Sequence, residues 1–517
     1  MTTTELSSRD ANAFDYLIVG GGTAGCVIAS RLAEYLPQKK ILLVEAGPSD
    51  FMNDKVLKLK DWLNLLGGEL DYDYGTTEQP NGKPFKHDAQ RWQSLGCEGW
   101  SFETFTRLLN NLRNTVQPVH LRHRNQLCKD WIQSCSTALN IPIIPDFNQE
   151  IVKNGNIEQG VGFFSVAYNP DSGHRSSASV AYIHPILRGE EHRPNLTILT
   201  NAWVSRVNVN ANSTVTGVNL TLQSGTPLTI TPKIETILSA GAVDTPRLLL
   251  HSGIGPRSQL QNLSIPLVKD IPGIGSNLLD HPESIIMWEL SRPVPPNQTT
   301  MDSDAGIFLR RSSTGPADIM MHCYQIPFCL NTARLGYDTP IDAFCMTPNI
   351  PNPKSKGRLY LTSADPAVKP ALDFQYFTGP TSHDATTIVA GLRAARRIAT
   401  EPPFSHWLKR EVAPGPSITT DSALSEYGRK VAHTVYHPAG TTKMGDLSRD
   451  ETVVVDARDL RVRGLGGVRI ADAGVFPEMT TANPMLTVLA IGERCAEMVA
   501  EEAGWRREGE KGLRARL

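Results

Sequence analysis

The fold of this chain is decided by residues 14–47, which read FDYLIVGGGTAGCVIASRLAEYLPQKKILLVEAG. The β-branched run at 15–19 predicts a strand, and hydrophobic residues at helical spacing predict a helix over 26–35. A second buried strand is expected at 41–44. A glycine-rich turn separates the first strand from the helix, which is typical of units that bind dinucleotides. We therefore expect a dinucleotide-binding unit at this end of the chain.

The turn is a G-x-G-x-x-G sequence formed by Gly20, Gly22 and Gly25. In this pattern the first glycine permits the tight turn, the second lets the backbone approach a pyrophosphate, and the third lets helix and strand pack closely. Thr23 and Ala24 complete the turn. The N–H groups at the start of the helix would face the phosphates with the positive end of the helix dipole. All five residues are candidate cofactor contacts.

Glu45 ends the second strand, twenty residues after Gly25. A carboxylate at this spacing can accept hydrogen bonds from the ribose of an adenosine. It would repel a 2′-phosphate, so NADP is disfavoured. This stretch alone does not separate FAD from NAD.

The composition excludes several classes of function. A net charge of −2 over 517 residues does not favour binding to nucleic acid or to an acidic membrane surface. No hydrophobic run approaches the ~20 residues of a membrane span. The eight cysteines form no C-x-x-C pair or metal-ligand set, so we expect reduced thiols and no metal site. The length is sufficient for two domains.

The rest of the chain mixes helical and antiparallel patterns. One amphipathic helix is expected over 92–114, alternating strands over 196–230, and a long helix over 485–503. Such a mixture after an opening nucleotide unit predicts a mixed α/β fold in which a sheet domain is inserted into a nucleotide-binding domain.

Three further stretches carry a resemblance. Residues 241–255 read GAVDTPRLLLHSGIG, and residues 272–282 read PGIGSNLLDHP. The third stretch joins HTVYHPAGT at 433–441 to RIADA at 469–473 and to Asn-Pro at 483–484. Together with the opening unit, these resemble the glucose–methanol–choline (GMC) oxidoreductase family over most of the chain. RSSASVAYIHP from Arg175 and the DHPE motif that ends at Glu283 are similar to the choline oxidase-like branch of that family.

The resemblance implies FAD, a Rossmann-type FAD-binding domain and an inserted antiparallel substrate-binding domain. It also implies oxidation of a primary alcohol, choline-like or otherwise small, by hydride transfer to the flavin, with O2 as the expected acceptor. The expected partners are thus a small-molecule alcohol and an electron acceptor. The expected FAD-binding segments are 14–120, 168–303 and 438–517, and the expected substrate-binding segments are 121–167 and 304–437.

His437 matches the active-site histidine of the family, and Asn483 matches its partner. The residue types suit the chemistry, because the hydroxyl proton must leave the alcohol as hydride leaves carbon. An imidazole with a pKa near neutrality can accept that proton, and an amide can orient the oxygen without adding charge.

The resemblance implies further cofactor contacts. Pro484 suits the first position of the final helix and Asn483 suits its N-cap, so the N–H of Met485 would face the flavin. Asp472 matches the acid that contacts the flavin. Val204 lies at the position whose backbone usually meets the adenine.

The substrate contacts implied by the resemblance include Asp304, at the position of a glutamate that faces a trimethylammonium group. Asn352 aligns with a second active-site histidine. Trp62 and Tyr436 could line a cage for a cation, although ordinary core packing explains them equally well.

One departure from the family follows Gly82. The family has a glycine-rich loop under the flavin there, and in choline oxidase-like members it carries the histidine that bonds covalently to FAD. Here Gly82 runs directly into Lys83, and the flanks match on both sides. His87 lacks the glycine frame and is not assigned as a flavin link. We therefore expect FAD, if bound, to be held non-covalently.

Alternatives remain open. Because of the departure after Gly82, one alternative is an inactive or weakly flavin-binding member of the family. Another is an enzyme like the hydroxynitrile lyases, which use flavin in a reaction without net redox. The final tripeptide, ARL at 515–517, is a conservative variant of the peroxisomal address SKL; otherwise a cytoplasmic location is expected. A homodimer is one of the assemblies left open.

Overall fold

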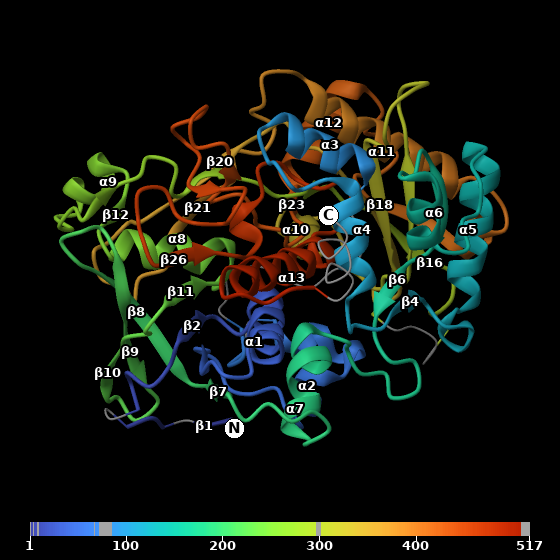
Figure 1. The fold of residues 1–517 in the computed structure, drawn as a ribbon. Helices are drawn as coiled ribbons and strands as arrows, with labels where there is room; N and C mark the ends of the chain where they lie inside the picture. Colours follow the sequence, from blue (N-terminus) through green and yellow to red (C-terminus); the bar gives the residue numbers. More distant parts are fainter. Residues whose placement is uncertain are drawn as a thin grey trace, which may run out of the picture.

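A parallel sheet of six strands holds the opening stretch of the chain (Figure 1). The computed structural model describes residues 2–3, 5–7, 10–66, 68–71, 85–295 and 301–507. The sheet order is β1 (Thr2–Thr3), β7 (Leu196–Leu199), β3 (Ile41–Val44), β2 (Tyr16–Val19), β11 (Glu235–Leu238) and β26 (Val468–Ile470). Every residue of β2, β3 and β11 is buried, as expected for parallel strands covered on both faces.

The predicted strand–turn–helix–strand unit is confirmed. Helix α1 (Thr23–Tyr35) begins three residues earlier than expected and follows β2 directly after the glycine turn. It packs beside the final helix, α13 (Met485–Glu502) (Figure 1). A Cβ atom on Gly492 of α13 would lie 3.0 Å from the carbonyl oxygen of Ala24, so the two helices approach closely there. Both helices begin beside the same cavity, described below.

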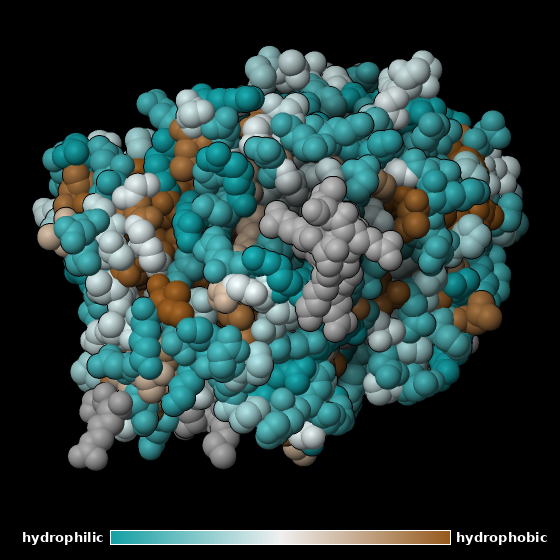
Figure 2. All heavy atoms as spheres, viewed as in Figure 1, coloured by the Kyte–Doolittle hydropathy of each residue, from teal (hydrophilic) through white to brown (hydrophobic). Residues whose placement is uncertain are grey.

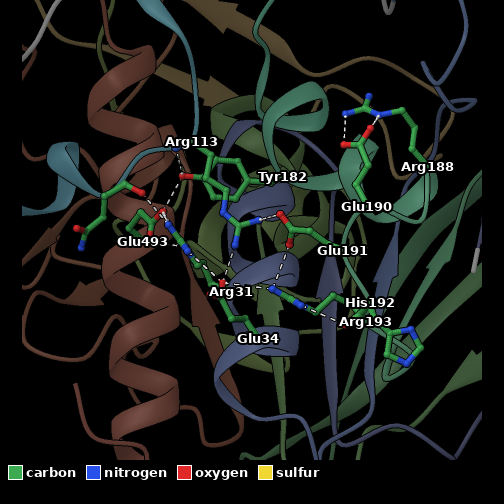
Figure 3. A network of polar contacts seen from close by, with 11 residues as sticks. Arg31, Glu34, Arg113, Tyr182, Arg188, Glu190, Glu191, His192, Arg193 and Glu493 are labelled. Carbon is green, nitrogen blue, oxygen red and sulfur yellow. Dashed lines mark hydrogen bonds and ion pairs between the residues drawn. The ribbon is translucent and has the colours of Figure 1, made fainter. Parts of the chain in front are cut away.

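A buried polar network ties α1 to α13 (Figure 3). Arg31 of α1 pairs with Glu493 of α13 at 2.9 Å, and the Tyr182 hydroxyl donates to the same carboxylate at 2.6 Å. Arg113 extends the network by donating to Glu34 at 2.7 Å. The side chain of Glu493 is only 1% exposed, so its charge depends on these partners.

A second, antiparallel sheet of eight strands forms the other half of the fold (Figure 1). Its main path is β22 (Leu408–Ala413), β16 (Ile286–Leu290), β19 (Ala343–Asn349), β18 (Ile319–Tyr324), β17 (Ala305–Leu309) and β5 (Gly160–Phe163), with β15 (Pro282–Glu283) and β23 (His433–Thr434) alongside. Its core is separate from that of the parallel sheet and includes α5 (Gln126–Leu139), α11 (His383–Ala399) and α12 (Asp421–Val431).

Two strands of the antiparallel sheet come from a segment that we expected in the FAD-binding domain. β15 and β16 pair with β19, yet both fall within the segment 168–303 expected in the FAD-binding domain. Strand pairing therefore joins the end of that segment, from Pro282, to the second sheet. The segment boundaries stay predictions.

The prediction of a single helix over 92–114 is wrong. The structure instead has α3 (Lys86–Ser94) and α4 (Phe102–Asn110). Gly96 and Gly99 lie between them with φ of +89° and +85°. These left-handed conformations, which suit glycine, turn the chain out of the helix.

The strands expected over 196–230 form β7, which lies between β1 and β3 in the parallel sheet, and a meander of β8 (Ala202–Val209), β9 (Val215–Leu222) and β10 (Pro227–Ile230). The remaining elements are mostly short: α2 (Asp54–Leu57), α6 (Phe147–Asn154), α7 (His184–Leu187), α8 (Gly241–His251), α9 (Arg257–Asn262), α10 (Leu330–Ala333), β4 (Val116–Pro118), β6 (Ser165–Ala167), β12 (Ile254–Gly255), β13 (Lys269–Asp270), β14 (Ser276–Leu278), β20 (Gly357–Tyr360), β21 (Ala371–Asp373), β24 (Met444–Gly445) and β25 (Val455–Asp456).

The face shown in Figure 2 is mainly hydrophilic, with hydrophobic residues in small scattered groups. Among the residues that the structure describes, no helix is both long and hydrophobic enough to cross a membrane.

Candidate active site

A cavity of about 860 Å³ opens at the carboxyl ends of β2 and β3. Ligand sites in such sheets lie outside the carboxyl ends of the strands. The cavity is lined by most of the residues predicted from the sequence: Gly20, Gly22, Thr23, Ala24, Glu45, Trp62, Val204, Tyr436, His437, Asp472, Asn483, Pro484 and Met485.

The glycine turn forms one wall of the cavity. A Cβ atom on Gly25 would lie 1.9 Å from the carbonyl oxygen of Gly20, so this position admits only glycine. A Cβ atom on Gly22 would meet its nearest atom at 3.9 Å, which leaves open space at that residue. Gly22 is also the N-cap of α1 and has no side chain to occupy the first N–H groups of the helix. The turn thus offers backbone donors and room for a ligand.

Glu45 is held at the edge of this turn. Its carboxylate accepts a hydrogen bond from the Gly21 N–H at 2.6 Å and another from the Gly47 N–H at 2.7 Å. These bonds fix the side chain at the cavity wall. Its contact with a ribose stays a prediction.

Asp472 is bonded within the protein. Its carboxylate accepts from the Gly241 N–H at 2.9 Å, the Thr245 hydroxyl at 2.6 Å and the Gly474 N–H at 2.8 Å. Burial raises the pKa of Asp472, and these hydrogen bonds oppose the rise. The side chain therefore fixes the turn before α8, and its contact with a flavin stays a prediction.

Asn483 does not cap the final helix, contrary to the expectation from the sequence. α13 begins at Met485, and Pro484 occupies the cap position with φ of −77° and ψ of −13°. Both polar atoms of the Asn483 side chain are buried and have no hydrogen-bond partner among the described residues. Because a buried amide without a partner is costly, this side chain fits a ligand that would satisfy it.

His437 lies on the same cavity wall and is only 5% exposed. Its main-chain N–H donates to Asp280 at 3.0 Å, and its ring Nδ1 lies 2.8 Å from Nδ1 of His281. Burial lowers the pKa of His437 well below its usual value, and the nearby His281 and His322 lower it further. His437 is therefore neutral at pH 7 and has a lone pair for a proton, but its lowered pKa, unlike the near-neutral pKa expected from the sequence, disfavours the protonated ring.

Trp62 and Tyr436 shape the cavity near His437. The Trp62 indole N–H donates to the carbonyl oxygen of Met301 at 3.1 Å. Tyr436 adopts a left-handed φ of +64°, and its N–H donates to the Thr434 hydroxyl at 2.7 Å. Both aromatic residues line the cavity, and their contact with a substrate or a cation stays a prediction.

Asp304 and Asn352 are not among the described residues that line the cavity. Asp304 is 1% exposed and accepts from the Gln325 amide at 3.4 Å. Asn352 donates to the Thr481 hydroxyl at 3.0 Å, and Thr481 is bonded in turn to Asp88 of α3. Their roles as substrate contacts stay predictions without support from this arrangement.

Sequence reasoning missed a second buried polar cluster. The Glu283 carboxylate is fully buried, 2.9 Å from Nε2 of His433 and 3.5 Å from Nδ1 of His322. Burial alone would raise the pKa of Glu283, but the two histidines lower it to about 2. Glu283 and His281 both stand in the DHPE motif that carried the resemblance. The motif could have marked Glu283 and His281 as site residues, whereas nothing in the sequence indicated that Glu283 would lie beside His322.

Two expectations fall outside the described residues: the junction after Gly82 and the final tripeptide at 515–517. His87 is described, at the start of α3, where its N–H donates to the Asn156 side chain at 3.3 Å. Among the described residues, the cavity wall does not include His87.

Comparison with known proteins decides the family. Sequence profiles described as GMC oxidoreductase match residues 79–283 and 353–492. The choline oxidase of Arthrobacter globiformis is 37% identical to this chain over 536 aligned positions, which cover 96% of this chain and 95% of the relative. The chain belongs to the GMC oxidoreductase family. Since the aligned positions outnumber the 517 residues of this chain, the relative has residues that this GMC protein lacks.

Other relatives agree with this assignment. The alcohol dehydrogenase [acceptor] of Pseudomonas putida is 29% identical over 95% of this chain and 96% of its own length. The oxygen-dependent choline dehydrogenase of Escherichia coli strain K12 is 29% identical over 94% of this chain and 95% of its own length. All are close to this GMC protein in length.

Solved structures support the fold. Pyridoxine 4-oxidase from Mesorbium loti superposes with a TM-score of 0.83 at 24% identity, covering 94% of this chain and 99% of its own. A formate oxidase superposes with a TM-score of 0.82 at 21% identity, covering 95% and 98%. The mixed α/β architecture of this GMC protein is therefore the one seen in these oxidases.

Proposed function

We propose that this GMC protein uses FAD to oxidise a primary alcohol. The observation that carries the proposal is one cavity that joins a glycine turn to a buried neutral histidine, His437, and to the unpartnered amide of Asn483. The relatives named for alcohol or choline oxidation support the reaction class.

The residues present fit FAD. The open space at Gly22 and the first N–H groups of α1 suit a pyrophosphate, and Glu45 at the adjacent strand end suits a ribose. Val204 in β8 would face the adenine. Pro484 and Met485, at the start of α13, would lie beside the isoalloxazine, where the positive helix end favours negative charge. Attachment is proposed to be non-covalent, because the histidine-bearing loop of the family is absent from the sequence.

The side chains of this protein would handle the substrate proton and oxygen. When bound, FAD would supply the acceptor for the hydride that leaves the alcohol carbon. The neutral ring of His437 would take the hydroxyl proton. The Asn483 amide N–H would donate a hydrogen bond to the alcohol oxygen, which would satisfy the buried Nδ2 atom. Trp62 and Tyr436 would exclude water from the reacting centre and contact the substrate.

The substrate is proposed to be choline or another small primary alcohol, with O2 as electron acceptor. Choline is supported by the 37% identity to a choline oxidase, and O2 by the oxidase and oxygen-dependent relatives. Choline would place its cationic group against Trp62 and Tyr436.

The test is to purify the full chain, record its flavin absorbance, and measure O2 consumption and peroxide with choline and with neutral alcohols of similar size. We expect bound flavin and substrate-dependent O2 uptake. His437→Gln should retain flavin and lose most of the turnover. A folded protein that binds no FAD would overturn the proposal.

A second candidate is a relative that binds at most the ADP half of FAD and does not turn over. The alignment with the choline oxidase relative favours it, since this chain lacks residues that the relative has. Inserting the family loop between Gly82 and Lys83 decides between the two candidates. Turnover only after insertion would support the second candidate, and turnover in the natural chain would refute it.

A further inference from the structure

The contact between His281 and His437 constrains where their protons lie. Nδ1 of one ring lies 2.8 Å from Nδ1 of the other, and both rings are buried, at 2% and 5% exposure. At this distance one nitrogen donates and the other accepts. The other contacts of His281 decide which ring donates the hydrogen bond.

The other nitrogen of His281 is a donor. Nε2 of His281 lies 2.8 Å from the carbonyl oxygen of Thr480 and 3.0 Å from that of Pro351. Carbonyl oxygens only accept hydrogen bonds, so Nε2 carries a hydrogen atom. Burial lowers the pKa of His281 to about 4, so the ring is neutral at pH 7 and has a single N–H. Nδ1 of His281 is therefore an acceptor.

The donor in the contact is consequently His437. We propose that His281 is a positioning residue that holds His437 in the tautomer with hydrogen on Nδ1, so that Nε2 is the basic atom available to the cavity. The alternative tautomers would leave the carbonyl oxygens of Thr480 and Pro351 without their donor and turn a lone pair toward them. Only the assignment of Nε2 to the hydroxyl proton rests on the proposed function.

The geometry around His437 supports the same orientation. The N–H of its main chain is bonded to Asp280, which also accepts a hydrogen bond from the Tyr376 hydroxyl. His437 lines the cavity while its Nδ1 is engaged with a ring that is buried behind it. Nε2 is thus the ring nitrogen left for a substrate.

Nitrogen-15 NMR of histidine-labelled protein tests the tautomer directly, with or without bound flavin. His437→Gln identifies the resonances of His437, and His192→Gln, at an exposed position, serves as the assignment control. We expect a pyrrole-type shift for Nδ1 of His437 and a pyridine-type shift for Nε2. The opposite pattern in the natural protein would overturn the proposal without any further variant.

Two substitutions then test the role of His281. His281→Phe removes the acceptor and keeps a ring, so a large share of His437 should shift to hydrogen on Nε2, and kcat should fall at least tenfold with a smaller change in KM. His281→Asn offers an amide oxygen near the former Nδ1. It should restore much of the His437 tautomer with hydrogen on Nδ1 and much of kcat. An unchanged His437 spectrum in folded His281→Phe would overturn the proposal. If the tautomer is as expected but no alcohol is oxidised, the proposed function fails and the tautomer assignment stands.

Discussion

The buried neutral ring of His281 makes the fold sensitive to acid. Burial lowers the pKa of His281 from 6.5 to about 4. Below pH 6.5 His281 binds a proton in the unfolded chain, whereas in the folded chain it stays neutral down to about pH 4. This contribution to stability is therefore fully present above pH 6.5 and is lost as the pH falls through about 4.

We expect the natural protein to lose more stability between pH 7.5 and pH 5.5 than His281→Asn does. The difference should be about 1 kcal/mol, since each unit of pKa shift corresponds to about 1.4 kcal/mol and only part of the shift is traversed. Urea unfolding at the two pH values measures it. Equal losses in both proteins would show that His281 is not a neutral buried ring.

The two glycines that flank the start of α1 should respond differently to alanine. Gly25→Ala would place a methyl group 1.9 Å from the Gly20 carbonyl oxygen, so the fold should be destabilised by several kcal/mol, of the order seen for severe overpacking. The methyl group of Gly22→Ala would lie 3.9 Å from its nearest atom, so the unfolding midpoint should stay close to that of the natural protein. It should nevertheless weaken FAD binding, because the methyl group enters the space proposed for the pyrophosphate. Urea unfolding and flavin titration together separate the two effects.

At the scale of elements, a polar network joins the middle of α1 to the middle of α13 (Figure 3), and the first residues of both helices border the cavity. The side chains of Arg31 and Glu493 are 10% and 1% exposed. Removing one partner of such a buried pair is destabilising, and Glu34, 3.0 Å from Arg31, would then be the carboxylate still paired with it. The nearby pair of Arg188 and Glu190 has side chains 43% and 56% exposed and offers a matched control.

Glu493→Gln should therefore lower the free energy of unfolding by about 3–5 kcal/mol. Glu190→Gln should leave it close to that of the natural protein, because exposed ion pairs contribute little. Denaturant unfolding of both variants, without added flavin, is the measurement. Similar small losses in both would mean that the network does not hold α1 against α13.

At the scale of the whole molecule, the cavity draws its walls from segments spread along the chain, from the β2–α1 turn to the start of α13. A ligand that fills it binds the folded state and not the unfolded chain. Binding should therefore raise the melting temperature.

FAD at about 100-fold above its dissociation constant should stabilise the protein by about 2.7 kcal/mol. ADP should stabilise it less at the same concentration, because it would contact only the turn and Glu45. Thermal unfolding with FAD, ADP or no ligand measures this order. Equal shifts with ADP and FAD would favour the candidate that binds only the ADP half.

The sequence predicted the parts of this protein that are encoded locally. The unit from β2 to β3 is confirmed, because its hydrophobic period and its glycines are set by neighbouring residues. The break between α3 and α4 was missed, because the hydrophobic spacing continued while Gly96 and Gly99 turned the backbone. The Asn483 cap was also wrong, since the helix starts after Pro484.

The sequence by itself determined the parallel nucleotide unit and marked His437 and Asn483 through short motifs. Only the tertiary structure brought His281 against His437, residues 156 positions apart, and placed Glu283 between His322 and His433. The physical reason is that these contacts arise from packing that joins distant segments, such as the pairing of β15 with β23 in the antiparallel sheet. Local periodicity specifies each segment, but the proton positions and charges of the site depend on which buried groups end up face to face.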